Sequence, residues 1–406
     1  MIDATTSAAD AHQRIWDAIV VGAGPAGAVT ALGLAQTGLR ALLVDHSNFP
    51  REKVCGGCLN ADAVSGIRKL GLGPQLDALG GVLLNRFCLS AGRQRVSLEL
   101  QADGPLQAGV AVSRGKLDAM LVEAAIAAGA NFLPNVRIRV SGGDEQAGVR
   151  QVICSDTDAS IMLQSRTVVV ATGLSADLQV DDPELAMRQS PQSRIGARTI
   201  ATSYPDHYAP GTIFMAVSRF GYVGLTRTEG NLLNIAAALE VKAVRETCPS
   251  AVCERILTDA GFPVSSKMLS GAWRGTIGLT RRRRKLASYR LFVVGDAAGY
   301  VEPFTGEGMA WAIHGGRAVV PFVEKAVNGW SPSLVGEWSQ TLRMLVTGRQ
   351  RLCRTFARIL RHPMLARWAI RIVATIPAIG RAVIRRLNKG NRDEFFDSGA
   401  GHGRAA

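Results

Sequence analysis

"DAIVVGAGPAGAVTALGLAQTGLRALLVD", residues 17–45, decides the fold. The apolar run from Ala18 to Val21 is typical of a buried parallel strand. It leads directly into a glycine-rich segment, and small apolar residues then continue as a helix to Gly38. A second apolar run ends at Asp45. The pattern predicts a βαβ unit whose GxGxxG loop follows the strand and opens the helix.

The glycines and the terminal acid of this segment each have a physical role. Gly22 permits the tight turn, Gly24 lets the backbone approach a pyrophosphate, and Gly27 lets the helix pack closely on the strands. The helix N-terminus presents free N–H groups to the phosphates. Asp45 stands where a carboxylate accepts hydrogen bonds from a ribose. The segment therefore predicts a dinucleotide-binding site.

The composition is that of a globular protein from a reducing compartment. The 406 residues are 47% hydrophobic and 20% charged, and the seven cysteines are few and scattered. The N-terminal residues carry no apolar signal-peptide core, and no run of about 18 uncharged apolar residues predicts a membrane-spanning helix. We therefore expect a cytoplasmic protein.

The net charge of +14 is concentrated near the C-terminus. Residues 343–392 hold thirteen Lys or Arg and no Asp or Glu, which leaves 14 − 13 = +1 for the rest of the chain. Within 349–390, arginines recur at helical spacing between apolar residues. This basic arm is expected either to lie on the inner face of the membrane, among anionic head groups, or to cover the substrate lobe. We expect no nucleic-acid binding, because no stacking platform accompanies the charge.

Further strands and helices follow the first unit. Residues 115–130 show helical spacing, and 167–173 are typical of a buried strand. A strand at 291–294 leads into a turn and then a helix from about 306. Between them, residues 194–240 form short strand-like segments that predict an antiparallel sheet. The basic run 281–285 is interpreted as a surface turn.

"FPREKVCGGCLN", residues 49–60, places two cysteines around a glycine pair. It could be a dithiol redox pair, part of a zinc site, or a loop that lies flat against a ligand. A disulfide reductase would carry a second GxGxxG, and zinc would need a second pair of ligands; the sequence offers neither. We therefore expect no metal site, and we favour the flat loop.

Three motifs together resemble flavoproteins of the p-hydroxybenzoate hydroxylase fold. They are the glycine loop 22–27, Arg51 with the glycine pair, and "VVGDAAG" at 293–299. Within that superfamily, "FPREKVCGGCL" and "EPFTGEGMAWAIHGG" are most similar to the geranylgeranyl reductase family. The resemblance covers residues 15–330. It implies an α/β fold with a Rossmann-type FAD-binding domain and an antiparallel β-sheet substrate domain, to which the chain adds its helical C-terminal arm.

The resemblance also implies how FAD would be held. Asp296 would bind a ribitol hydroxyl, and the helix from about Gly306 would direct its N-terminus at the N1–C2 edge of the flavin. Arg51 and Arg114 would contact the cofactor. The expected FAD contacts are Gly22, Gly24, Pro25, Ala26, Gly27, Asp45, Arg51, Gly56, Gly57, Arg114, Gly295, Asp296, Gly306, Gly308 and Met309.

In the same family the CGG stretch lies beside the isoalloxazine ring. Gly56 and Gly57 are then expected because no side chain fits between the backbone and the ring. Cys55 would line the substrate face. The role of Cys58 stays open, since related proteins usually have a small residue there.

The sequence departs from the family pattern at two places. Related proteins carry an aromatic-rich strand that corresponds to "GYVGLT", 221–226, where Gly224 stands in place of a tryptophan. The change predicts a wider pocket and, with the absence of lysine between 209 and 231, argues against a halogenase. Thr172 replaces the aspartate of hydroxylases that bind NADPH directly. Electrons are therefore expected from NADPH by another route or from a protein donor.

Three residues are the candidates for catalysis. Cys55 is expected on the substrate face, and Tyr222 is either a proton donor or a packed strand residue. Glu307 is either a proton relay or a carboxylate that orders its loop. His314 is expected to be a helix-surface or packing residue.

These observations predict an FAD-dependent oxidoreductase acting on a hydrophobic, isoprenoid- or polyketide-like small molecule. Reduction of a C=C bond by reduced flavin is favoured; the alternatives are aromatic hydroxylation through a C4a-hydroperoxyflavin and a membrane-bound flavin electron carrier. The expected divisions are a flexible tail (1–15), an FAD-binding domain (16–80, 108–185 and 285–345), a substrate domain (81–107 and 186–284) and the basic arm (346–406).

Overall fold

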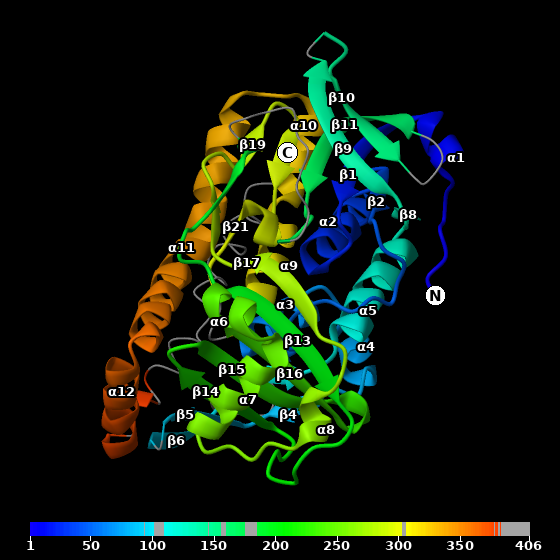
Figure 1. Cartoon of the computed structure of the whole chain (residues 1–406). Coiled ribbons are helices and arrows are strands. Elements are labelled where there is room, and N and C mark those ends of the chain that lie inside the picture. The colour runs from blue at the N-terminus through cyan, green and yellow to red at the C-terminus, as the bar shows by residue number, and fades with distance from the viewer. Residues whose placement is uncertain are drawn as a thin grey trace.

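The structure is a computed structural model that places a mixed α/β body beside a long helical arm (Figure 1). It describes residues 1–92, 94–100, 109–144, 146–155, 160–174, 185–302, 306–376, 378–380 and 382. The fold class expected from the sequence is confirmed.

The first sheet has eight strands and is built around β1 (Ile15–Val21). β1 pairs in parallel with β11 and β2, so that Ala18 lies between Thr167 and Ala41. These central strands are apolar and almost fully buried, as the sequence pattern predicts. The other strands are β2 (Ala41–Val44), β8 (Asn131–Leu133), β9 (Arg137–Asp144), β10 (Val149–Ser155), β11 (Ser160–Val170), β19 (Ala287–Ser288) and β20 (Leu291–Val293).

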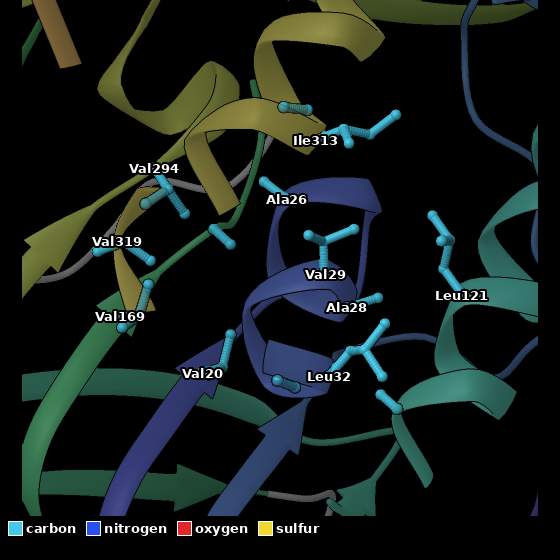
Figure 2. Packing of buried hydrophobic residues seen from close by; sticks show 14 of the residues in the cluster. Val20, Ala26, Ala28, Val29, Leu32, Leu121, Val169, Val294, Ile313 and Val319 are labelled. Carbon is cyan, nitrogen blue, oxygen red and sulfur yellow. The ribbon is translucent and has the colours of Figure 1, made fainter. Parts of the chain in front are cut away.

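Helix α2 (Pro25–Gln36) packs between β1, α5 (Arg114–Ala127) and α9 (Gly308–Ala318). Figure 2 shows Leu32 pointing toward Leu121 of α5, and Ala26 on the side that faces Ile313 of α9. A Cβ atom at Gly316 of α9 would lie 2.4 Å from the backbone oxygen of Ala26, so the two helices approach too closely for a side chain there. The remaining helices of this region are α1 (Ala8–His12), α3 (Ala61–Arg68), α4 (Gly73–Ala78) and α10 (Val320–Asn328).

The second sheet has seven strands and is mostly antiparallel, as predicted for residues 194–240. Only its pairing of β14 with β5 is parallel. Its outer face packs on α7 (Pro249–Asp259) around Tyr208, Phe214 and Phe262. The sheet order is β17 (Arg274–Gly278), β13 (Ile195–Ala201), β16 (Leu232–Leu239), β15 (Gly221–Thr228), β14 (Thr212–Ser218), β5 (Arg86–Ala91) and β6 (Gln94–Glu99), with α6 (Val241–Glu246) and α8 (Ser266–Leu269) nearby in sequence.

Two small sheets connect these layers. One joins β3 (Cys58–Leu59), β7 (Gly109–Ala111) and β4 (Val82–Leu84), and the other joins β12 (Met187–Gln189), β18 (Arg281–Arg283) and β21 (Gly299–Tyr300). The surface turn predicted over 281–285 is therefore wrong. Arg283 donates to the Ala297 carbonyl at 2.6 Å, and burial, then Arg281, lowers its pKa to about 10. The charge run concealed a strand because its pairing partners lie far away in sequence.

The described part of the C-terminal arm comprises the second half of α11 (Ser333–Arg361) and α12 (Pro363–Thr375). Figure 1 shows α11 running along the body from the first sheet to the second, where α12 covers β5 and β6. Helix α11 passes through residue 346, where we placed the start of the arm, because its first turns already pack on the first domain through Trp338. No helix among the described residues is long and apolar enough to cross a membrane.

Candidate functional site

One cavity of about 1530 Å³ extends from the glycine loop to the second sheet and α12. Its wall near the first sheet is formed by the loops that follow β1, β2 and β11, so the cavity begins at the carboxyl ends of parallel strands. Its other wall is apolar. Among the lining residues are the predicted positions Gly22, Gly24, Pro25, Ala26, Asp45, Arg51, Cys55, Gly56, Arg114, Tyr222, Asp296, Gly306, Gly308 and Met309.

The glycine loop closes as its sequence requires. Gly22 has φ 104° and donates to the Val44 carbonyl at 2.7 Å. A Cβ atom at Gly27 would lie only 1.8 Å from the Gly22 oxygen, which no side chain could tolerate. Asp45 is fixed at the end of β2, where its Oδ2 accepts from the Ala23 amide at 2.7 Å. The carboxylate predicted to face a ribose is thus held beside the loop.

Two guanidinium groups converge on Gly24. A Cβ atom at Gly24 would lie 3.6 Å from Arg51 Nη2 and 3.8 Å from Arg114 Nη2. Arg114 is held by two 2.8 Å bonds to Asp118, and Arg51 Nη2 lies 3.6 Å from both Asp45 and Asp118. Arg51 Nε is buried and has no hydrogen-bond partner among the described residues. Two cations beside a helix N-terminus fit a pyrophosphate, and the unsatisfied N–H favours a bound anion.

Asp296 follows a sharp turn at Gly295, whose φ is 61°. A Cβ atom at Gly295 would lie 2.9 Å from the Ala26 Cβ, so the turn packs directly on α2. Burial raises the pKa of Asp296, while Lys53 and Arg114 oppose that change. Burial lowers the pKa of Lys53, helped by Arg114 and Arg51. Lys53 lines the cavity and was not predicted; its place in the motif that contains Arg51 was the available signal.

The N-terminus of α9 faces the same cavity. Gly306, Gly308 and Met309 line it, and the positive end of the helix dipole therefore points inward. Glu307 is fully buried, and its Oε2 accepts from the Trp311 indole at 3.1 Å. It is not among the described residues that line the cavity, which favours its role in ordering the loop. His314 is buried against Asp62 at 3.0 Å, as expected of a packing residue.

The CGG stretch forms part of the cavity wall. Glycine is needed at its two glycine positions for different physical reasons. A Cβ atom at Gly56 would meet no protein atom within 4 Å, so its backbone faces open space where a flat ring could lie. Gly57 has φ 70°, and a Cβ atom there would lie 3.2 Å from the Val112 oxygen, so the backbone conformation requires this glycine. Gly57 is not among the described residues that line the cavity.

Cys58 lines the cavity as a neutral thiol. Burial, together with the nearby Cys55, raises the pKa of Cys58 to about 12. A thiol that stays protonated is a poor nucleophile and a poor metal ligand, which disfavours the dithiol and zinc interpretations. Across the described ranges, no group of three or more His, Cys, Asp or Glu could hold a metal ion.

The far chamber of the cavity is apolar and lies between the second sheet and the arm. Small residues form part of its floor, including Gly224, where a Cβ atom would make only an ordinary 3.4 Å contact with Met215. The wider pocket expected from Gly224 agrees with this space. The apolar residues of the chamber are Phe87, Leu89, Val96, Leu98, Ile213, Met215, Leu225, Leu279, Ile359, Leu360, Ala366, Ile370 and Val373.

A buried polar cluster stands behind the chamber, and no residue spacing in the sequence reveals it. Arg194 is fully buried and donates to Glu240 at 2.7 Å and to Glu302 at 3.0 Å. The pKa of Tyr222 is raised by burial and then by Glu302, to which its hydroxyl is hydrogen-bonded. Arg361, the last residue of α11, lies 3.9 Å from the second oxygen of Glu302. Tyr222 therefore lies in the cavity wall, and its hydroxyl is already hydrogen-bonded to Glu302.

Comparison with known proteins agrees with this geometry. Residues 16–179 match the family of FAD binding domains. Because the cradle fits that cofactor as well, the chain is an FAD-dependent oxidoreductase.

The chain is similar in sequence to several known proteins, among them two reductases and a receptor. The chain is 23% identical over 347 residues to digeranylgeranylglycerophospholipid reductase of Methanocaldococcus jannaschii, covering 80% of this chain and 82% of that protein. It is 25% identical over 397 residues to menaquinone reductase of Mycobacterium tuberculosis, with 89% and 91% covered. It is 27% identical to conditioned medium factor receptor 1 of Dictyostelium discoideum, covering 78% of this chain but only 64% of that protein. The resemblance to the geranylgeranyl reductase family is confirmed by the two reductases.

Solved structures share the fold. The chondrochloren halogenase CndH superimposes with a TM-score of 0.74 at 19% identity, covering 94% of this chain and 91% of the halogenase. The probable FAD-dependent monooxygenase PqsL of Pseudomonas aeruginosa gives 0.71 at 16% identity, with 87% and 98% covered. At these identities the likeness speaks for the fold alone.

Proposed function

We propose that this protein reduces a C=C bond of a long hydrophobic molecule of the isoprenoid or polyketide class. The continuity of the cavity carries the proposal. The same space that is bounded by the FAD cradle opens into a chamber walled by aliphatic residues. A cavity of about 1530 Å³ exceeds the size common for one small ligand, so cofactor and substrate fit together.

The chain's own residues have distinct tasks in this proposal. Arg51 and Arg114 would hold the pyrophosphate of FAD, and the N-terminus of α9 would stabilise negative charge on the flavin. The aliphatic chamber excludes water and orients the apolar chain beside Gly56 and Cys55. Reduced FAD, when bound, supplies the hydride. The electrons come from NADPH or from a protein donor, since Thr172 replaces the residue used for direct NADPH binding.

We infer that the substrate enters from a membrane surface through the arm. The inner face of α12 lines the chamber with Ala366 and Ile370, whereas its outer face exposes Met364 (83%), Leu365 (53%) and Trp368 (67%). The arm is also the basic part of the chain. Exposed apolar side chains among arginines favour an interface with anionic lipid.

Flotation with vesicles tests the membrane contact. Wild type should float with phosphatidylglycerol vesicles but not with phosphatidylcholine vesicles, and Leu365→Ser with Trp368→Ser should abolish flotation. Leu83→Ser is the matched control, because Leu83 is 57% exposed on β4, away from the arm. If the double variant floats as wild type does, α12 is not the contact.

Stopped-flow mixing tests the reaction. The protein is reduced anaerobically and mixed with geranylgeraniol, a menaquinone or an alkylphenol, and separately with O2. Reoxidation by an unsaturated lipid that is much faster than reoxidation by O2 supports a reductase. Fast reoxidation by O2 that requires the alkylphenol supports the alternative, an aromatic hydroxylase. Reoxidation only by another redox protein would favour the electron carrier.

A further inference from the structure

Tyr300 occupies the junction between the two parts of the cavity. It ends β21, where it pairs with Arg281, and its side chain lines the cavity. The ring packs against the apolar cluster that contains Met215, Leu279 and Leu360 of the chamber. Asp296 and Cys55, which line the same cavity, lie near enough for their charges to raise the pKa of the Tyr300 hydroxyl. No motif in the sequence singled it out.

The hydroxyl of Tyr300 is free to serve a ligand. Within the described ranges it makes no hydrogen bond to the protein. Burial raises its pKa well above the ordinary value, and the neighbouring Asp296, Tyr222, Cys55 and Glu302 raise it further. The phenol therefore keeps its proton at physiological pH. A protonated donor that lines the cavity and has no hydrogen-bond partner in the described ranges is ready to act as an acid.

Two of the other candidate acids are committed elsewhere. The Tyr222 hydroxyl bonds to Glu302, which Arg194 holds in place. The thiol of Cys58 donates to the Gly56 carbonyl at 3.5 Å. Cys55 Sγ accepts from the Gly57 amide at 3.4 Å and from Arg114, so two donors orient this sulfur while its own proton stays available; Cys55→Ala is therefore tested beside Tyr300→Phe.

We propose that Tyr300 is the catalytic acid of the reduction. The inference rests on the proposed function. Hydride adds to one carbon of the double bond and breaks its π bond; the Tyr300 O–H bond breaks as a C–H bond forms at the other carbon. The two electrons and one hydrogen come from reduced FAD, and the second hydrogen comes from Tyr300, which then regains a proton from water.

The test compares Tyr300→Phe with Tyr222→Phe in the lipid that wild type reduces fastest. We expect Tyr300→Phe to lower kcat by about 10²-fold or more, with KM and the Kd for FAD unchanged, because a positioned acid contributes about 10²–10⁴-fold. We expect Tyr222→Phe to lower kcat much less than Tyr300→Phe does. If Tyr300→Phe retains the wild-type kcat, the proposal is overturned.

A binding measurement separates this result from the proposed function. Geranylacetone has a carbonyl acceptor, and the alkene that lacks the carbonyl is its control. Tyr300→Phe loses one neutral hydrogen bond, about 0.5–1.5 kcal/mol, so its Kd for geranylacetone should rise by about 2- to 13-fold. Its Kd for the alkene should not change. If wild type reduces no lipid, the proposed function fails, and the binding measurement alone decides whether Tyr300 donates a hydrogen bond. Weaker binding of geranylacetone but not of the alkene by Tyr300→Phe supports that role. Wild-type affinity of Tyr300→Phe for both ligands overturns it.

Discussion

Replacement of Arg51 by methionine should weaken FAD binding while leaving the fold intact. The guanidinium lies 3.6 Å from where a Gly24 Cβ would be, and its side chain is only 12% exposed. Methionine keeps an apolar stem of similar length, although it loses the guanidinium carbon that lies 4.8 Å from the centroid of the Phe49 ring. It removes the charge, and it leaves Asp45 with one cation fewer beside the cofactor's phosphates.

The size of the effect follows from the bond that is lost. A hydrogen bond to a charged group contributes about 1.5–3 kcal/mol, which corresponds to about 10- to 150-fold in Kd. The assay titrates FAD into apoprotein and follows the quenching of flavin fluorescence. Arg40→Met is the matched control, since Arg40 is 56% exposed and pairs with Asp17. If Arg51→Met and Arg40→Met bind FAD equally well, our placement of the pyrophosphate is wrong.

Three further predictions concern the loop, the thiols and the chamber. Gly27→Ala should purify without stoichiometric FAD, because the new Cβ atom would lie 1.8 Å from a backbone oxygen. Gly336→Ala is the control and should keep its flavin, because a Cβ atom there would meet no atom within 4 Å. A yellow Gly27→Ala protein would contradict the loop assignment. Cys248 should be alkylated first of the seven cysteines, because it is exposed and because hydrogen bonds from Ser250 and the Ala251 amide lower its pKa. More thiolate is then present at neutral pH. Peptide mass spectrometry that finds another cysteine labelled earlier would contradict this prediction. Gly224→Trp should raise KM for a long-chain lipid about 15-fold, as expected if its ring displaces two methylenes at about 0.8 kcal/mol each, and an unchanged KM would place the lipid elsewhere.

The parts of the fold that sequence reasoning predicted are those with local causes. Gly22, Gly24 and Gly27 stand at fixed spacing after a buried strand, so the loop and its neighbours follow from sequence alone. The strand at Arg281–Arg283 could not be predicted from sequence alone, because it pairs with Met187–Gln189 and Gly299–Tyr300, which are distant in the chain. Tertiary pairing there outweighed the charge of the run.

The site divides in the same way. Motif residues such as Asp45 and Asp296 were predicted and line the cavity. Arg194 is 108 residues from Glu302, which follows closely after Tyr300, and only the folded chain brings Arg194 to this place. The arm was an open question for the same reason, since the chamber that α12 covers exists only once both sheets have formed.

The most direct test of the central claim is the mass of the product. Protein reduced with dithionite is incubated without oxygen with geranylgeraniol, a menaquinone or an alkylphenol, and in parallel under air enriched in ¹⁸O2. The account predicts an anaerobic product that has gained two hydrogen atoms on carbon, both of them deuterium when reduction and turnover take place in D2O, because the N5–H of reduced flavin and the tyrosine O–H both exchange with solvent. A product that forms only under oxygen and carries an ¹⁸O atom would contradict it and establish a hydroxylase instead.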